Sequence, residues 1–351
     1  MKLSLCFFLA SLLSIGAPAA ASATQHDGAH DFDFEVGTWN IAVRRLQRPL
    51  TGSTTWTAPA GYVHVVRKLW DGRASLAELE NERTAPHYIG MMLRLYDPQS
   101  QQWSIYWAGS RDGAVDPPLV GSFQNGRGEF FNQELVDGKP VYVRVVYSEI
   151  APESFHTEQS FSVDGGKTWE TNLIQTFIRR SPLPQDTSAA TVADPGHQHD
   201  FDFEFGSWTT HLRRLVHPLS GSGTWIDLDG TSVVHKIWNG SANVGELEVA
   251  NATSSIEGLT LRLYNPATAQ WSIYFANSAA PSLGTAAMVG RFSNGRGEFY
   301  DQELFNGKAI FVRFTFDEIT PHSFRLVQSF SADGGRTWEP NWIASFARTR
   351  A

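Results

Sequence analysis

Apolar and polar residues alternate along most of this 351-residue chain, so side chains of one kind recur at every second position. Runs with this alternation, such as 88–96, 102–108 and 139–149, are separated by Asp-Gly, Asn-Gly, Asp-Pro and Gly-Gly pairs. A period of two is that of a β-strand, and such pairs form the tight turns of hairpins. No segment sustains the period of a helix. The pattern predicts an all-β protein whose antiparallel strands are joined by local turns.

The pattern occurs twice because the chain contains two copies of one unit. The segment "HDFDFEVGTWNIAVRRL" at 30–46 returns as "HDFDFEFGSWTTHLRRL" at 199–215, and "NGRGEFFNQEL" at 125–135 returns as "NGRGEFYDQEL" at 294–304. A shift of 169 residues exceeds the repeat length of a solenoid, so it indicates duplication of a whole domain. About ten strands in each copy of roughly 150 residues predict two tandem antiparallel up-and-down β-barrels, with sandwiches as the alternative.

The two segments "FDFEVGTW" and "FDFEFGSW" resemble the G-x-W opening of lipocalin-like (calycin) barrels. Nearly all of each copy is similar to a lipocalin-like family of exported bacterial proteins of unknown function. The resemblance implies that Trp39 and Trp208 close the barrel floors. It also implies a cavity that holds a ligand, but it names no ligand, because one fold serves many functions.

The first residues have the three parts of a secretory signal peptide. Lys2 supplies a positive charge, residues 3–15 form a short apolar core, and Ala21-Ser22-Ala23 is a small-x-small cleavage site. The only cysteine, Cys6, lies inside this segment, so we expect a mature chain without disulfides or thiol ligands. No later stretch approaches the length of about 18 apolar residues that suggests a membrane helix. We therefore expect export across the inner membrane, to the periplasm, without membrane insertion.

Domain boundaries follow from the signal and the duplication. Residues 180–198 are rich in Pro, Ser, Ala and Thr, which is typical of a flexible linker. We expect a signal peptide over 1–23, a first barrel over 24–179 and a second barrel over 199–351. The formal net charge of −8, with no basic cluster, argues against nucleic acid as a partner. An aromatic content of 13%, with 12 Trp, favours strands and large cores.

Each copy contains one Asp box of the sialidase type, "FSVDGGKTWE" at 161–170 and "FSADGGRTWE" at 330–339. A sialidase repeats the box on several propeller blades and adds an arginine triad, which has no counterpart in this sequence. A purely structural role needs only the turn chemistry, because an Asp carboxylate accepts backbone N–H groups and Gly tolerates positive φ. We expect a structural hairpin in both copies, built on the residues Asp164, Trp169, Asp333 and Trp338.

Four arginines lie in the middle of predicted strands: Arg94 and Arg144, with the counterparts Arg262 and Arg313. Each lies on a strand face that contains aromatic or polar residues, opposite a face that is apolar. If the mixed faces line the cavity, these arginines could bind a ligand carboxylate in a bidentate manner. If the mixed faces contact water, they are solvated exterior residues, which is the usual arrangement in a barrel.

Paired acids offer a second candidate site, with Glu78 and Glu80 on one strand face and Glu246 and Glu248 on another. Two carboxylates at this spacing can raise one pKa and provide a general acid. They could also pair with the strand arginines inside the barrel, or form a ladder on its exterior. The exterior ladder is the simplest interpretation, and the catalytic pair is the weakest.

Other chemistry is sparse. Tyr106 and Tyr274 are candidates for orienting a ligand. His64 and His156 have no histidine counterpart in the second copy, which disfavours haem, and the H-x-H segments lack a third metal ligand. The sequence has no G-x-S-x-G, P-loop or Rossmann motif, so we expect no cofactor and no metal.

Three functions remain compatible with these features. The leading hypothesis is an exported protein that binds a small, partly apolar molecule in a barrel cavity, anionic if Arg94 or Arg144 faces that cavity. The enzyme alternative is a cofactor-free isomerase, cyclase or decarboxylase that uses the same cavity with Glu78 or Glu80. The third is an envelope interaction module with solid barrels and an exposed apolar patch. The sequence leaves the oligomeric state open.

Overall fold

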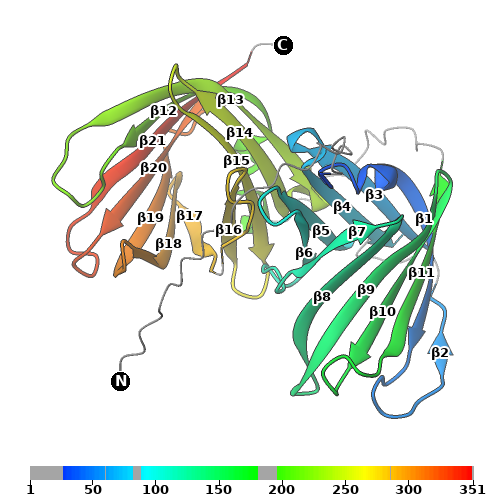
Figure 1. The fold of residues 1–351 in the computed structure, drawn as a ribbon. Coiled ribbons are helices and arrows are strands. Elements are labelled where there is room, and N and C mark those ends of the chain that lie inside the picture. The colour runs from blue at the N-terminus through cyan, green and yellow to red at the C-terminus, as the bar shows by residue number, and fades with distance from the viewer. Residues whose placement is uncertain (1–26, 60, 82–87, 181–195, 285, 350–351) are drawn as a thin grey trace, which may run out of the picture.

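The computed structural model describes residues 27–59, 61–81, 88–180, 196–284 and 286–349. The expected signal peptide and most of the expected linker lie outside these ranges. Two closed antiparallel β-barrels follow one another along the chain (Figure 1). The predicted all-β fold of two tandem barrels is therefore confirmed.

The first barrel is an up-and-down ring in which each strand is antiparallel to the next. The ring closes where β11 pairs with β1, from Thr38 opposite Arg180 to Arg45 opposite Leu173. The short β2 pairs with the end of β1. The strands are β1 (Gly37–Leu46), β2 (Trp56–Thr57), β3 (Tyr62–Leu69), β4 (Ala74–Asn81), β5 (Tyr88–Asp97), β6 (Gln102–Gly109), β7 (Leu119–Gln124), β8 (Arg127–Val136), β9 (Lys139–Ala151), β10 (Ser154–Ser162) and β11 (Glu170–Arg180).

The second barrel repeats this topology, and its ring closes where β21 pairs with β12. One long strand, β13, takes the place of β2 and β3. The strands are β12 (Gly206–Leu215), β13 (Trp225–Ile237), β14 (Ala242–Ala250), β15 (Ser255–Asn265), β16 (Gln270–Asn277), β17 (Met288–Ser293), β18 (Arg296–Phe305), β19 (Lys308–Asp317), β20 (Ser323–Ser331) and β21 (Glu339–Arg348).

A short 3-10 helix, η1 (Asp33–Glu35) or η4 (Asp202–Glu204), precedes the first strand and closes one end of each barrel. We call this end the floor. In the first barrel, Trp39 is fully buried there and donates its indole N–H to the Glu35 carbonyl at 2.7 Å. The Arg179 guanidinium lies 4.1 Å from the centre of the Trp39 ring and also donates to backbone carbonyls of the floor segment. Trp208 and Arg348 repeat this arrangement in the second barrel.

Both Asp boxes form turns at the β10–β11 and β20–β21 connections. The Asp164 carboxylate accepts the backbone N–H groups of Lys167 and Thr168 at 3.0 and 2.9 Å. It also accepts the Thr168 and Ser162 hydroxyls, while the Ser162 oxygen accepts the Gly166 N–H at 2.8 Å. Asp333 makes the same set of contacts. The carboxylates are used within their own turns, as a structural hairpin requires.

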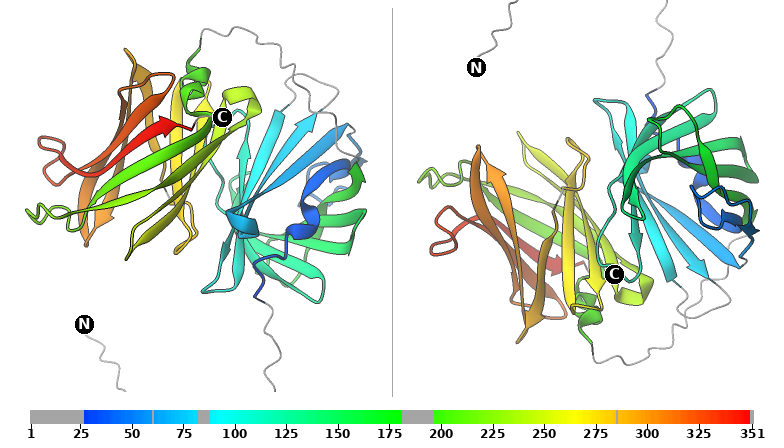
Figure 2. Two further views of the ribbon diagram at one scale, coloured as in Figure 1. Left: turned by 90° about the horizontal axis from the view of Figure 1, so that it is seen from above. Right: turned by 90° about the horizontal axis from the view of Figure 1, so that it is seen from below.

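The two barrels pack side by side through the outer faces of β4–β6 and β14–β16 (Figure 2). One apolar cluster joins both, including Leu93 and Leu95 from the first barrel and Leu261 and Leu263 from the second. The remaining 3-10 helices are η2 (Trp70–Gly72), η3 (His197–His199) and η5 (Trp238–Gly240), and η2 and η5 contribute their tryptophans to this cluster. The outer faces of these strands are therefore buried, as their inner faces are.

Four of the polar contacts across this interface form two reciprocal pairs. The backbone N–H of Trp70 donates to the Glu246 carboxylate at 3.0 Å, and the backbone of Trp238 is hydrogen-bonded to the Glu78 carboxylate. Likewise the Leu283 N–H donates to the hydroxyl of Tyr106, and the Val115 N–H donates to that of Tyr274. This approximate two-fold symmetry follows from the duplication, because equivalent surfaces of the two copies face each other.

Candidate ligand cavity in the first barrel

Each barrel encloses a cavity, and the two differ in size. The first has a volume of about 760 Å³ and the second about 310 Å³. In the second barrel, Phe314 and Trp342 stand where the first has the smaller Val145 and Leu173, and these bulkier side chains fill part of the space. The first cavity lies within the range of small-molecule sites, and the second lies at its lower limit.

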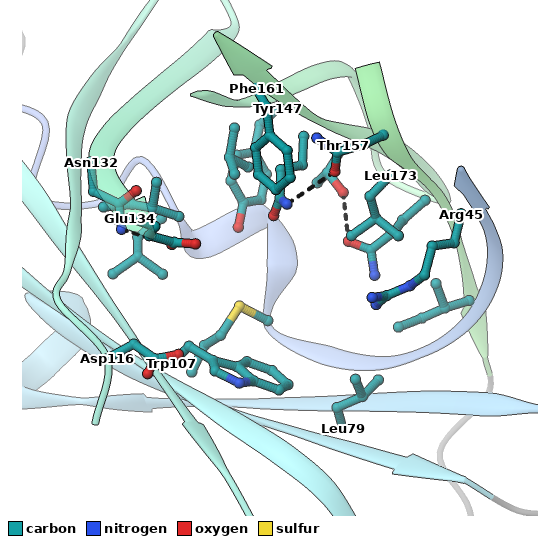
Figure 3. A pocket seen from close by; sticks show the side chains of 18 of the residues that line it. Arg45, Leu79, Trp107, Asp116, Asn132, Glu134, Tyr147, Thr157, Phe161 and Leu173 are labelled. Atoms are coloured by element: carbon teal, nitrogen blue, oxygen red, sulfur yellow. Dashed lines mark hydrogen bonds between the residues drawn. The ribbon is translucent and has the colours of Figure 1, made fainter. Parts of the chain in front are cut away.

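The first cavity has an apolar wall and a polar wall that face each other (Figure 3). Leu79 and Trp107 lie on one side, on the strands nearest the second barrel, and Thr157 and Leu173 lie on the opposite side, on β10 and β11. The apolar wall consists of Leu79, Met92, Ile105, Trp107 and Leu119. An amphipathic molecule could lie between these walls with a different chemical surface against each.

The polar wall has hydroxyl and amide groups between apolar side chains such as Leu173 and Phe177. The Thr157 hydroxyl donates to the Gln175 side-chain oxygen at 3.0 Å, and the Gln159 amide donates to Asn172 at 3.1 Å. The amide nitrogen of Asn172 is buried and has no hydrogen-bond partner among the described residues. In the second barrel Leu326 and Ala344 replace Thr157 and Gln175, so half of the polar wall is absent there.

Four polar side chains gather at the floor of the first cavity: Glu35, His64, Arg94 and Tyr147. Arg94 forms an ion pair with Glu35, with 2.8 Å between Nη2 and Oε2, and His64 Nε2 lies 3.0 Å from Glu35 Oε1. The Tyr147 hydroxyl is hydrogen-bonded to Arg94. Glu35, His64 and Tyr147 line the cavity, and even Tyr147, the most exposed of the four, is only 3% exposed.

Electrostatics fix the charge states of Glu35 and Tyr147 on this floor. Burial raises the pKa of Glu35, but the neighbouring Arg94 and His64 outweigh it, so the pKa lies below its ordinary value. Burial raises the pKa of Tyr147 to about 12, so its hydroxyl keeps its proton at neutral pH. Glu35 is thus an anion beside the Arg94 cation, and their charges cancel.

The second barrel has a simpler floor. Glu204 and Arg262 repeat the ion pair at 2.8 Å, but Ser232 stands at the position of His64 and Phe316 at that of Tyr147. With one cation and no imidazole beside it, burial raises the pKa of Glu204 to about 7. The two copies have kept the ion pair and diverged in the residues around it.

The open end of the first cavity carries charges of both signs. Figure 3 shows Arg45 on one side, and Asp116 and Glu134 on the other. Burial raises the pKa of Asp116, and the nearby Glu134 carboxylate adds to this effect. The mouth therefore has no single charge that would select an anionic or a cationic ligand.

The structure separates the four arginines that the sequence analysis grouped together. Arg94 and Arg262 point inward and are neutralised by Glu35 and Glu204, not by Glu78 or Glu80. Arg144 and Arg313 point outward, where they lie 4.6 and 4.4 Å from the ring centres of Trp169 and Trp338. The expectation that Arg144 and Arg313 bind a ligand in the cavity is corrected, because the alternation of β9 and β19 directs Val145 and Phe314 inward instead.

The candidate acids and tyrosines also lie outside the cavities. Glu78 forms an ion pair with Arg67 at 2.6 Å, and burial against the second barrel raises its pKa. Glu80, Glu246 and Glu248 share the outward orientation of their strands, since Leu79 and Leu247 point inward. Tyr106 and Tyr274 are hydrogen-bonded between the barrels. None of these side chains lines either of the two cavities, so the geometry gives no support to the catalytic and ligand-binding expectations for them.

Two floor residues, Glu35 and Tyr147, were not among the candidates from the sequence, and His64 was considered there only as a haem ligand and disfavoured. A signal for Glu35 was present, because the "FDFE" segment recurs in both copies with its glutamate. His64 and Tyr147 could not be found in that way, because each differs from its counterpart in the otherwise similar second copy. Comparing the copies for polar residues unique to one of them would have identified both.

No family model matches the chain, and no curated protein matches it. Among solved structures, a protein of unknown function from the DUF3598 family of Nostoc punctiforme is similar over 93% of this chain and 100% of its own, with 10% identity and a TM-score of 0.28. A double mutant of transferrin binding protein B from Haemophilus parasuis is similar over 90% of this chain and 76% of its own, with 8% identity and a TM-score of 0.20. Similarities at these scores carry no conclusion about the cavity. None of the helices in the described ranges has the length and apolar character needed to cross a membrane.

Proposed function

We propose that this chain is an exported, lipocalin-like binding protein whose first barrel holds a small, partly apolar molecule without net charge. The observation that carries the proposal is the cavity of about 760 Å³ between an apolar wall and a wall of amides and hydroxyls. Buried apolar area contributes about 25 cal/mol per Å², and a few polar groups then fix the orientation of the ligand.

The charge balance of the floor argues for a neutral ligand. An anionic ligand was compatible with the sequence because the sequence does not reveal the partner of Arg94. Since Glu35 already neutralises Arg94, a ligand carboxylate would enter a buried site without a free cation. Burying an unpaired charge is costly, so a neutral polar group fits this floor better.

In this proposal the second barrel has a structural role, which is to pack against the first. Its cavity of about 310 Å³ is narrowed by aromatic side chains and has lost part of the polar wall. Its outer surface instead packs against β4–β6, the strands that carry the apolar wall of the first cavity. The solid-barrel interaction module is a weaker candidate, because the first barrel is not solid.

A cavity-filling substitution tests the proposal. Leu173→Trp introduces the residue that stands at the equivalent position of the second barrel, Trp342, and should displace any occupant. The matched control is Leu135→Trp, at a side chain that is 73% exposed on the outside. Small molecules extracted from the purified proteins are compared by mass spectrometry, and added 2-acetylnaphthalene serves as a probe in equilibrium dialysis.

We expect the unsubstituted protein and Leu135→Trp to retain the same molecule and to bind the probe, and Leu173→Trp to lose both. If the unsubstituted protein neither carries a small molecule nor binds the probe, binding in the first barrel is refuted.

A further inference from the structure

In the part of the chain that the structure describes, the hydroxyl of Tyr147 donates no hydrogen bond. Arg94 has only donor groups, so in the hydrogen bond between them the Tyr147 oxygen is the acceptor. The phenolic proton is then left to donate elsewhere, and no hydrogen bond joins it to another of the described residues. Tyr147 lines the first cavity and is only 3% exposed, so the remaining direction for this donor is the cavity itself.

His64 adds a second unsatisfied group at the same place. Its Nε2 faces the Glu35 carboxylate, which can only accept, so Nε2 carries a proton. Nδ1 is buried and has no partner among the residues that the structure describes. Buried polar groups in proteins are nearly always paired, and two unpaired groups on one cavity floor indicate a polar occupant.

Resting on the proposed binding function, we propose that the floor of the first cavity is a subsite for a neutral carbonyl oxygen, which accepts the hydrogen bond of Tyr147. The class of ligand is a ketone, ester or amide with an apolar body that lies along the wall of Leu79, Met92 and Trp107. The Arg94 cation behind the phenol polarises its O–H bond and strengthens the donor. A carboxylate is excluded from this class because Glu35 has already balanced Arg94.

The second barrel lacks this subsite. Phe316 has no hydroxyl and Ser232 has no imidazole, although Glu204 and Arg262 remain. The second barrel of the duplicated chain is therefore a natural reference for the first, because its floor has the same ion pair and no phenol toward the cavity. Tyr147→Phe converts the first floor toward the second while removing a single oxygen atom.

Two probes of the same shape isolate the hydrogen bond. The ketone 2-acetylnaphthalene has a carbonyl oxygen where 2-isopropenylnaphthalene has a methylene carbon. Binding of each is measured by equilibrium dialysis to the full chain, to Tyr147→Phe and to Tyr142→Phe. Tyr142 is the matched control because it lies on the same strand and is 48% exposed on the outside.

We expect Tyr147→Phe to weaken binding of the ketone about tenfold, as the loss of one buried hydrogen bond does, and to change binding of the alkene less than about twofold. Tyr142→Phe should change neither. The infrared carbonyl stretch of the bound ketone should lie at lower frequency in the unsubstituted protein than in Tyr147→Phe, which reports the hydrogen bond independently of affinity.

Equal losses for both probes, or an unchanged carbonyl stretch, would overturn the carbonyl subsite and leave the binding function intact. Failure of the unsubstituted protein to bind either probe would instead overturn the binding function, and the subsite with it.

Discussion

His64 and Glu35 are joined inside the first barrel by a contact of 3.0 Å between Nε2 and Oε1, and the equivalent residues of the second barrel, Ser232 and Glu204, make no such contact among the described residues. The pKa values of the two buried carboxylates, Glu35 and Glu204, are also shifted in opposite directions. The pKa of Glu35 lies below its ordinary value, whereas burial raises that of Glu204 to about 7. The two barrels should therefore respond in opposite ways to pH.

The first prediction concerns Glu204. Its pKa is about 7 in the folded protein and 4.5 as the ordinary value, so folding favours the protonated form. The contribution of Glu204 to stability is then fully present below about pH 4.5 and is lost as the pH rises through 7. Ser232→His supplies the missing imidazole, lowers the pKa of Glu204 and should flatten this dependence.

Urea unfolding of the parent chain and of Ser232→His between pH 5 and 8 measures the effect. Thr231→His is the control, because its side chain follows the strand alternation to the outside of the barrel. A dependence on pH that is as steep in Ser232→His as in the parent chain would contradict the assignment to Glu204.

Much of the fold could be predicted from the sequence because turns and alternation agree. The predicted strand over 139–149 begins at Lys139, after the Asp137-Gly138 turn, and β9 in the structure runs from Lys139 to Ala151. Asp137 adopts the positive φ that such a turn requires. Strand ends could be located because each turn carries its own local signal.

The site could not be predicted in the same way, because alternation separates two faces of a strand without saying which is inside. In β5 the apolar face of Leu93 and Leu95 looks like a core face, but it packs against the second barrel while Arg94 points inward. In β9 the apolar face is the inner one and Arg144 points outward. A strand buried on both sides defeats the rule that the apolar face points into the barrel.

The second prediction concerns the contact of Glu246 with the other barrel. Removing its carboxylate in Glu246→Ala leaves the Trp70 N–H without its acceptor in a largely apolar interface. We expect a loss of about 1–2 kcal/mol in the free energy of unfolding. Glu248→Ala, on the same strand face but exposed, should change it by less than about 0.5 kcal/mol. Similar losses for both variants would argue against a stabilising role of this contact.

The third prediction concerns the Asp box. Hydrogen bonds from the backbone and side chain of Thr168, and from Ser162, lower the pKa of Asp164 to about 2. The contribution of this turn to stability is therefore present above about pH 4 and is lost as the pH falls through 2. Asp164→Ala should lower the midpoint of thermal unfolding at pH 7 and leave binding of 2-acetylnaphthalene unchanged.

Differential scanning calorimetry and dialysis on the same samples provide the measurements, with Val163→Ala as the control at an adjacent exposed side chain. Loss of binding together with an unchanged unfolding midpoint would show that the box takes part in binding and does not merely hold the turn.

The fourth prediction contrasts the two arginines that the sequence presented as equivalent. Arg94 is fully buried and its partner Glu35 is 1% exposed, so Arg94→Met leaves a buried carboxylate without its cation. Breaking a buried pair in this way costs about 3–5 kcal/mol. Arg144→Met removes a guanidinium that lies over Trp169 at the surface, where such a contact contributes about 0.5–1 kcal/mol. Chemical denaturation at pH 7 should therefore separate the two variants by at least about 2 kcal/mol.

The double variant Arg94→Met with Glu35→Leu distinguishes the cost of an uncompensated charge from the cost of lost packing. If the cost of Arg94→Met comes from the uncompensated charge on Glu35, removing that carboxylate as well should restore part of the stability, since an apolar pair can replace a buried ion pair at little cost. If the cost came only from lost packing around Arg94, the second substitution would add to it. Recovery of stability in the double variant would show that the ion pair at the cavity floor acts as one unit, which is the condition for Arg94 to polarise Tyr147 without attracting an anion.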